Sequence, residues 1–112
     1  MAISHAKSAE VIDIMPLGAN RDNAQTTTLV KTDSLEVTRL VLPAGKEIKR
    51  HQVPGEITVF CLEGNVAFQA GDTDCTLTGG KLIHLAGSVG HALHAIEDSS
   101  LLVTILLKHK EL

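Results

Sequence analysis

The chain has 112 residues, a formal net charge of −3 and 44% hydrophobic residues, which suits one domain that buries roughly two thirds of its unfolded surface. No basic run is longer than Lys49-Arg50, so nothing indicates a nucleic-acid or anionic-membrane partner. The only aromatic residues are Phe60 and Phe68, which leaves almost nothing on which a base or a sugar ring would stack.

Neither a signal peptide nor a membrane span is visible. Residues 1–10 lack the continuous apolar stretch of a secretory signal, and the apolar run Leu101–Leu107 is far too short to cross a bilayer. We therefore expect a cytoplasmic protein without a membrane partner. In that compartment Cys61 and Cys75 are expected to be reduced and to act as small apolar strand residues.

The chain is punctuated by turn signals rich in Gly, Pro and Asn, with short runs of Val, Ile, Leu and Thr between them. This pattern is typical of an antiparallel β-sandwich or barrel. The strands that we expect are Leu35–Leu42, Glu56–Leu62, Asn65–Ala70, Asp74–Leu77, Lys81–Leu85, His91–Ile96 and Leu101–Leu107. The alternation in Glu56–Leu62 places Ile57, Val59 and Cys61 on one face, and we expect Asn65–Ala70 to form a hairpin with this strand.

The domain organisation that we expect is simple. A single domain spans residues 1–112, with a core over about 35–107, an N-terminal arm over 1–8 and a solvated tail over 108–112. The apolar pattern of Ala6–Met15 fits a helix, or equally a strand from Val11 to Ile14.

Two glycine-bounded segments carry histidines at comparable positions. In the first, His51 follows Gly45 by six residues, and Gly64 closes the segment; in the second, Gly80 precedes a strand and a tight turn that lead to His91. These segments resemble the two motifs of the cupin superfamily, the small RmlC-like barrels of the germin and phosphomannose-isomerase kind. The resemblance implies an all-β, antiparallel double-stranded β-helix, or jelly-roll barrel, commonly dimeric and with a ligand cavity at its mouth.

The resemblance departs from the family pattern in two ways. Four side chains of the cupin motifs hold a divalent metal, and the matching positions here are His51, Val53, Ile57 and His91, of which two cannot ligate. In the second motif the family's proline and glycine are also replaced, by Ala86 and Ser88.

A third metal ligand would have to come from outside the motif positions. One candidate is Glu56, which reaches the cavity only if a bulge at Pro54-Gly55 shifts the strand register. The other is His84, on the strand that leads to the His91 turn. The apolar residues at the ligand positions favour a different function. Val53 and Ile57, together with Val59 and Cys61, would line a dry cavity suited to a small hydrophobic or acidic molecule.

Three classes of function therefore stay open. The first and preferred one is a binder of an unidentified small molecule, with His51 and His91 in an apolar cavity. The second is a metal-dependent cupin enzyme of dioxygenase or isomerase type that uses iron, manganese, zinc or nickel, held by His51, His91 and Glu56 or His84. The third is a structural or interaction protein with a vestigial site. In each class we expect a homodimer.

Overall fold

The computed structural model describes residues 5–18 and 25–107. Within these ranges the chain forms strands and no long helix, and no helix there is long and apolar enough to cross a membrane. The strands are β1 (Thr27–Lys31), β2 (Leu35–Leu42), β3 (Glu47–His51), β4 (Ile57–Glu63), β5 (Asn65–Ala70), β6 (Thr73–Thr78), β7 (Leu82–Leu85), β8 (His91–Ala95) and β9 (Ser99–Leu106). The predicted tail over 108–112 and the first four residues of the predicted arm lie outside the described residues.

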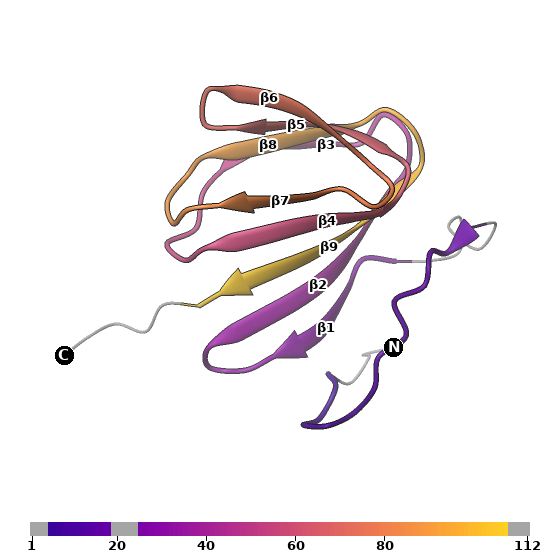
Figure 1. Ribbon diagram of the computed structural model, residues 1–112, viewed down its shortest axis with the longest axis vertical. Coiled ribbons are helices and arrows are strands. Elements are labelled where there is room, and N and C mark those ends of the chain that lie inside the picture. The colour runs from indigo at the N-terminus through magenta and orange to yellow at the C-terminus, as the bar shows by residue number, and fades with distance from the viewer. Residues whose placement is uncertain (1–4, 19–24, 108–112) are drawn as a thin grey trace.

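The strands form two antiparallel sheets that face each other (Figure 1). One sheet has five strands in the order β1-β2-β9-β4-β7, and the other has four in the order β3-β8-β5-β6. Strands that follow one another in sequence repeatedly lie in different sheets, which is the arrangement of a jelly roll. The predicted all-β jelly-roll fold is confirmed.

Sequence patterning located most of the strands. Leu35–Leu42 and Asn65–Ala70 match β2 and β5, and the other predicted strands differ from the observed ones by one or two residues at an end. The pattern missed β1 and β3, whose sequences TTLVK and EIKRH carry few apolar residues. Both lie at a sheet edge, where only one neighbouring strand supports them and little apolar surface is buried.

The predicted hairpin between β4 and β5 is wrong. These strands belong to different sheets, and β5 pairs with β6 and β8 instead. The chain crosses between the sheets at Gly64, whose φ of +102° is accessible to glycine and strained for other residues. This crossing brings Phe68 on β5 opposite the inner face of β4 rather than beside it.

The N-terminal segment 5–18 forms neither the helix over Ala6–Met15 nor the strand over Val11–Ile14 that its pattern predicts, so both alternatives are wrong. It runs as irregular chain with few backbone hydrogen bonds to the sheets. The backbone N–H groups of its last two residues donate to the carboxylate of Glu63 over 2.7 and 3.0 Å. Two charge-assisted hydrogen bonds therefore fix the end of this segment to the end of β4.

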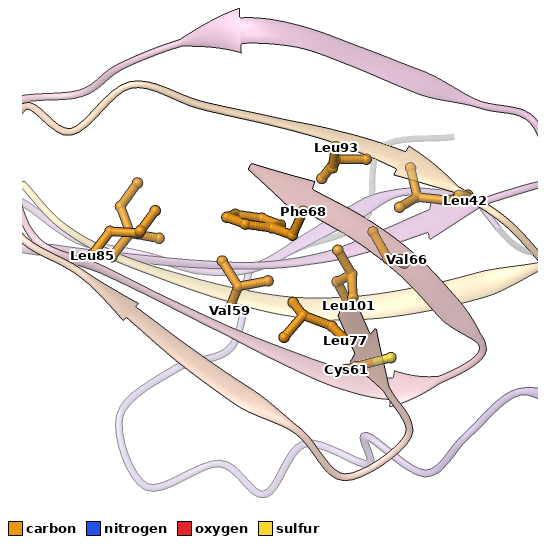
Figure 2. Packing of buried hydrophobic residues seen from close by; sticks show 11 residues of the cluster. Leu42, Val59, Cys61, Val66, Phe68, Leu77, Leu85, Leu93 and Leu101 are labelled. Carbon is orange, nitrogen blue, oxygen red and sulfur yellow. The ribbon is translucent and has the colours of Figure 1, made fainter. Parts of the chain in front are cut away.

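The core lies between the sheets (Figure 2). The alternation predicted for β4 is observed, because Ile57, Val59 and Cys61 are buried at 3% exposure or less. Val66 and Phe68 of the four-stranded sheet and Leu101 of β9 meet them in the same cluster. Burying such a side chain stabilises the fold by about 1.5–3 kcal/mol, so this double layer of aliphatic residues is the main source of stability.

Replacing Gly64 tests the crossing between the sheets. A Cβ atom at this position would overlap the Ser99 hydroxyl and approach the Asp98 carbonyl oxygen to 2.6 Å, in addition to the backbone strain. We expect Gly64→Ala to lower the free energy of unfolding by about 3 kcal/mol or more, measured by urea denaturation. Gly45, with φ +88° and open space around it, is the matched control: Gly45→Ala is expected to cost only the strain of about 1–2 kcal/mol. Equal losses would contradict this account of the crossing.

Candidate functional site: a pocket with two histidines

The space between the sheets contains a pocket with a volume of about 190 Å³. Its lining is mainly aliphatic and comes from both sheets. The residues are Leu40, Ile48, Val53, Ile57, Val59, Phe68, Leu93, Val103 and Ile105, with the polar Glu36, Thr38, His51 and His91. Most of the lining offers no hydrogen-bond partner, so the few polar groups would orient whatever enters the pocket.

The structure brings the two motif histidines together in this pocket. His51 ends β3 and His91 begins β8, and the two residues are direct partners across these antiparallel strands. Their ring centroids are 4.2 Å apart, with the rings tilted by 59°. His91 is only 6% exposed and lies parallel to the ring of Phe68, whereas His51 is exposed at the mouth.

Both imidazole rings are held in one tautomer by the backbone. Nδ1 of His51 lies 3.0 Å from the carbonyl oxygen of Lys49, and Nδ1 of His91 lies 3.1 Å from that of Val89. A carbonyl oxygen can only accept, so each Nδ1 carries the proton and donates it. In a neutral ring the lone pair is then on Nε2. The pair therefore offers two acceptor nitrogens to a ligand.

Burial keeps the His91 ring neutral. Desolvation lowers the pKa of His91, and the electrostatic interactions with His51 and Arg50 lower it further, against the opposing effect of the Val89 hydrogen bond. The Arg50 guanidinium packs against Gly90, where it takes the space that a side chain would occupy. At neutral pH His91 is thus an uncharged hydrogen-bond acceptor.

Two loops hold the mouth of the pocket in place. The backbone N–H of Ser88 donates to the carbonyl oxygen of Val53 over 2.8 Å, which ties the loop before His91 to the loop after His51. Ser88 has a φ of +64°, a left-handed conformation that glycine adopts without strain. The serine in the motif's glycine position therefore keeps the glycine conformation.

Glu56 and His84 lie outside the pocket and do not reach the histidine pair. Glu56 precedes β4, which enters the sheet in register with Ile57 facing inward, so no bulge turns the carboxylate toward the cavity. His84 lies on the outward face of β7. The two side chains pair with each other instead, with His84 Nε2 and Glu56 Oε1 separated by 2.8 Å and both side chains 57% exposed.

Of the four residues expected to line the cavity, Val53, Ile57 and Val59 do so, and Cys61 does not. Cys61 faces the interior, but it lies about 7 Å further along β4 than Val59, within the closed core. Burial raises the pKa of its thiol, which is the opposite of what a nucleophilic cysteine needs.

The sequence reasoning missed the pocket residues of β2 and β9, although both strands were predicted. Thr38 and Leu40 share a face with the buried Leu42, and Val103 and Ile105 share one with the buried Leu101. Strand alternation alone would have selected them. What it does not reveal is which inward residues meet a neighbour and which border a void.

A second, shallower depression lies on the outer face of the four-stranded sheet, with a volume of about 590 Å³. It contains His94, which alternation places on the face opposite to His91 and whose Nδ1 lies 3.2 Å from Glu47 Oε1. This groove is larger but more open, and its histidine is already paired. The inner pocket is the better candidate because it is more enclosed and because its histidine Nε2 atoms have no partner in the part of the chain that the structure describes.

Comparison with known proteins identifies the family. The family model for the cupin domain matches residues 38–107. The chain belongs to the cupin family. No functionally curated protein matches the sequence. The predicted resemblance is therefore confirmed at the level of the family.

Solved structures agree with this assignment. A conserved protein of unknown function from Streptococcus pyogenes is 25% identical with a TM-score of 0.76, over 98% of this chain and 97% of that one. A cupin superfamily protein from Desulfitobacterium hafniense has a TM-score of 0.76 at 14% identity, over 92% and 100%. A predicted oxalate decarboxylase from Thermotoga maritima has a TM-score of 0.67 at 20% identity, over 74% and 79%. At these identities the last two similarities concern the fold alone.

The donor set of this cupin does not fit the four-ligand metal centre that the family motifs specify. His51 and His91 supply two nitrogens, and the other two motif positions, Val53 and Ile57, are hydrocarbon. Among residues 5–18 and 25–107, no group of three His, Cys, Asp or Glu side chains is placed to hold an ion. Two neutral imidazoles match only a labile divalent ion that takes its remaining ligands from elsewhere.

The lowered pKa of His91 predicts a pH dependence of stability. The unfolded chain binds a proton at His91 more readily than the folded chain does. The stability that the neutral His91 contributes is therefore fully present above the unfolded pKa of about 6.5 and is lost as the pH falls toward the folded pKa. We expect the free energy of unfolding of the wild type to decrease as the pH is lowered from about 8 to about 5. The free energy of unfolding of His91→Gln is expected to decrease less over the same range. Urea denaturation at a series of pH values measures this. His94→Gln, on the outer face, is expected to keep the wild-type slope; a His91→Gln slope equal to wild type would contradict the assignment.

Proposed function

We propose that this cupin binds a small, largely apolar molecule that carries a hydroxyl group, with the apolar body between the sheets and the hydroxyl at the histidine pair. The observation that carries the proposal is an apolar pocket with two histidines whose Nδ1 atoms are both bonded to backbone carbonyls. Such a site combines a desolvated lining with a few convergent polar groups, which is the usual composition of a small-molecule site.

The protonation state of His91 favours a hydroxyl over a carboxylate. The ring of His91 is kept uncharged, so its Nε2 accepts a hydrogen bond and cannot donate one. A hydroxyl donates to it directly, whereas a carboxylate would need a protonated imidazole in a site that disfavours the charge. The cationic Arg50 is committed to Gln69 and Gly71, to which its Nη1 donates over 3.4 and 3.2 Å, and it does not line the pocket.

The dimensions of the pocket limit the size of the ligand. Its volume of about 190 Å³ is below the roughly 300–1,000 Å³ of pockets for drug-sized molecules. Among residues 5–18 and 25–107, the acidic residue that lines the pocket is Glu36, and its carboxylate forms an ion pair with Lys31 at 2.7 Å. A compact aliphatic or monocyclic alcohol suits these dimensions and this charge distribution better than a sugar or a nucleotide.

A ligand panel tests the proposal. The probes are cyclohexanol, benzyl alcohol and short-chain aliphatic alcohols, each beside the matching carboxylic acid. A ligand at about ten times its Kd should stabilise the folded protein by about 1.4 kcal/mol, which raises Tm by several degrees in a domain of this size. We expect the alcohols to raise Tm at neutral pH, and we expect this shift to shrink on acidification as His91 gains a proton.

Two matched variants locate the bound molecule. Val53→Phe adds a ring at the pocket mouth and is expected to abolish the alcohol-induced shift, whereas Ala67→Phe adds the same ring in the outer groove and should leave it unchanged. Stabilisation by acids rather than alcohols would reject the hydroxyl assignment. A shift lost in Ala67→Phe and kept in Val53→Phe would move the site to the outer groove.

Weak binding of a divalent metal is the second candidate function. It is favoured by the same carbonyl contacts, since a metal-binding histidine commonly donates its other ring N–H to a carbonyl or carboxylate and presents the free nitrogen to the ion. Iron, manganese, zinc and nickel are the ions to test, as neutral imidazole suits zinc, iron and nickel in particular.

Elemental analysis of untagged protein checks the metal. If the histidine pair holds an ion, we expect sub-stoichiometric metal that dialysis against a chelator removes without unfolding the protein, and that is lost in His91→Gln. His94→Gln is the control and should retain the metal content of the wild type. Metal at one equivalent that resists the chelator would instead indicate a complete site and overturn the two-ligand description.

A further inference from the structure

The inner pocket has a carboxylate on the wall opposite the histidine pair. Glu36 of β2 shares the inward face of its strand with Leu40 and the buried Leu42, and it lines the pocket. An inward-facing strand position normally holds an apolar side chain. The side chain of Glu36 is only 26% exposed, so this charged group is partly withdrawn from water.

Glu36 and the histidine pair lie at the same end of the sandwich, on facing sheets. Glu36 shares a cross-strand row with Ile105 of β9 and Ile57 of β4. The chain leaves β3 at His51 and enters β4 at Ile57, so the His51 end of one sheet meets the Ile57 end of the other. Figure 1 shows the connections β1–β2, β3–β4 and β7–β8 together on the left. A molecule in the pocket therefore has Glu36 on one wall and the histidine pair on the other.

The ion pair of Glu36 does not by itself account for this placement. Oε1 of Glu36 lies 2.7 Å from Nζ of Lys31, its cross-strand partner on β1. The Lys31 side chain is 45% exposed, and ion pairs in contact with solvent add little to stability. The contact occupies one carboxylate oxygen, and the second has no protein partner among the residues that the structure describes.

The polar atoms that face the pocket are mainly hydrogen-bond acceptors. Nε2 of each histidine accepts when its ring is neutral, and the carboxylate of Glu36 only accepts. Thr38, the remaining polar lining residue, has its hydroxyl 3.4 Å from that of Thr28. A ligand that satisfies both walls must therefore present hydrogen-bond donors at two separate places.

We propose that the ligand of this pocket is a compact diol, with one hydroxyl group at the histidine pair and the other at Glu36. This inference rests on the proposed alcohol site and names the class of alcohol. Lys31 favours a neutral hydroxyl over an ammonium group as the second donor, because it already balances the carboxylate and would repel another cation. Glu36 then determines specificity, since it distinguishes a diol from an alcohol of similar shape with one hydroxyl group.

Isothermal titration calorimetry at neutral pH with matched ligands tests the proposal. The probes are linear diols with terminal hydroxyl groups and a chain of four to six carbon atoms, each beside the n-alcohol with the same chain. We expect the best diol to bind about tenfold more tightly than its n-alcohol, because a hydrogen bond to a charged acceptor outweighs the lost hydration of the second hydroxyl.

Glu36→Gln removes the charged acceptor with little change of shape. We expect the Kd of the diol to rise about tenfold, and the Kd of the n-alcohol to change by less than about twofold. Glu47→Gln is the matched control, because Glu47 is a carboxylate that pairs with His94 on the outer face of the four-stranded sheet. It should keep both wild-type values. Far-UV circular dichroism and Tm confirm that each variant is folded.

Lys31→Met is the reciprocal variant, since it removes the cation that balances Glu36 at an exposed position. Its probe is the amino alcohol in which an amine replaces one terminal hydroxyl of the best diol. We expect the wild type to bind the diol more tightly than the amino alcohol, and Lys31→Met to reverse this order.

The outcomes separate this proposal from the alcohol site on which it rests. A diol and an n-alcohol with equal Kd values in the wild type would overturn the diol assignment and leave the alcohol site intact. An advantage of the diol that persists in Glu36→Gln would overturn the role of Glu36. A wild type that prefers the amino alcohol would show that the second group is a cation. If neither diols nor n-alcohols bind, the proposed function itself fails.

Discussion

Contact between inward-facing aliphatic residues of two sheets holds this molecule together, and this contact is complete at only one end. At the closed end Cys61, Val66 and Leu101 are fully buried. Toward the other end the same strands reach Ile57 on β4, Phe68 on β5 and Ile105 on β9, which border a pocket. A dense interior at one end of the same strands gives the pocket at the other end rigid walls, as close-packed cores deform little.

The histidine pair depends on this arrangement. His51 and His91 are paired across β3 and β8, so their separation is set by the spacing of neighbouring strands rather than by flexible loops. The backbone then sets their tautomer through two carbonyl contacts. Two ring nitrogens held in this way, in an apolar pocket, are suited to orienting a ligand. The hydrocarbon at Val53 and Ile57 separates this cupin from one that surrounds a metal with four donors.

The outer faces of the two sheets differ in polarity. The four-stranded sheet presents paired polar groups such as His94 and Glu47 to solvent, as expected of a face in contact with water. The five-stranded sheet presents Phe60 and Leu82, with exposed hydrophobic residues of the N-terminal segment nearby. The same set of strands therefore lines the inner pocket on one face and presents apolar side chains on the other.

The sequence by itself determined the fold class, most of the strands and the inward face of β4, because period-two alternation and turn residues act over a few neighbours. It also determined that His51 and His91 occupy motif positions whose partners are hydrocarbon. Only the tertiary structure decided that β4 and β5 separate at Gly64, that Glu56 and His84 pair outside the pocket, and that Cys61 lies in the closed core. These outcomes depend on contacts between residues far apart in sequence, and local patterns carry no information about which inward side chain meets a neighbour and which meets a void.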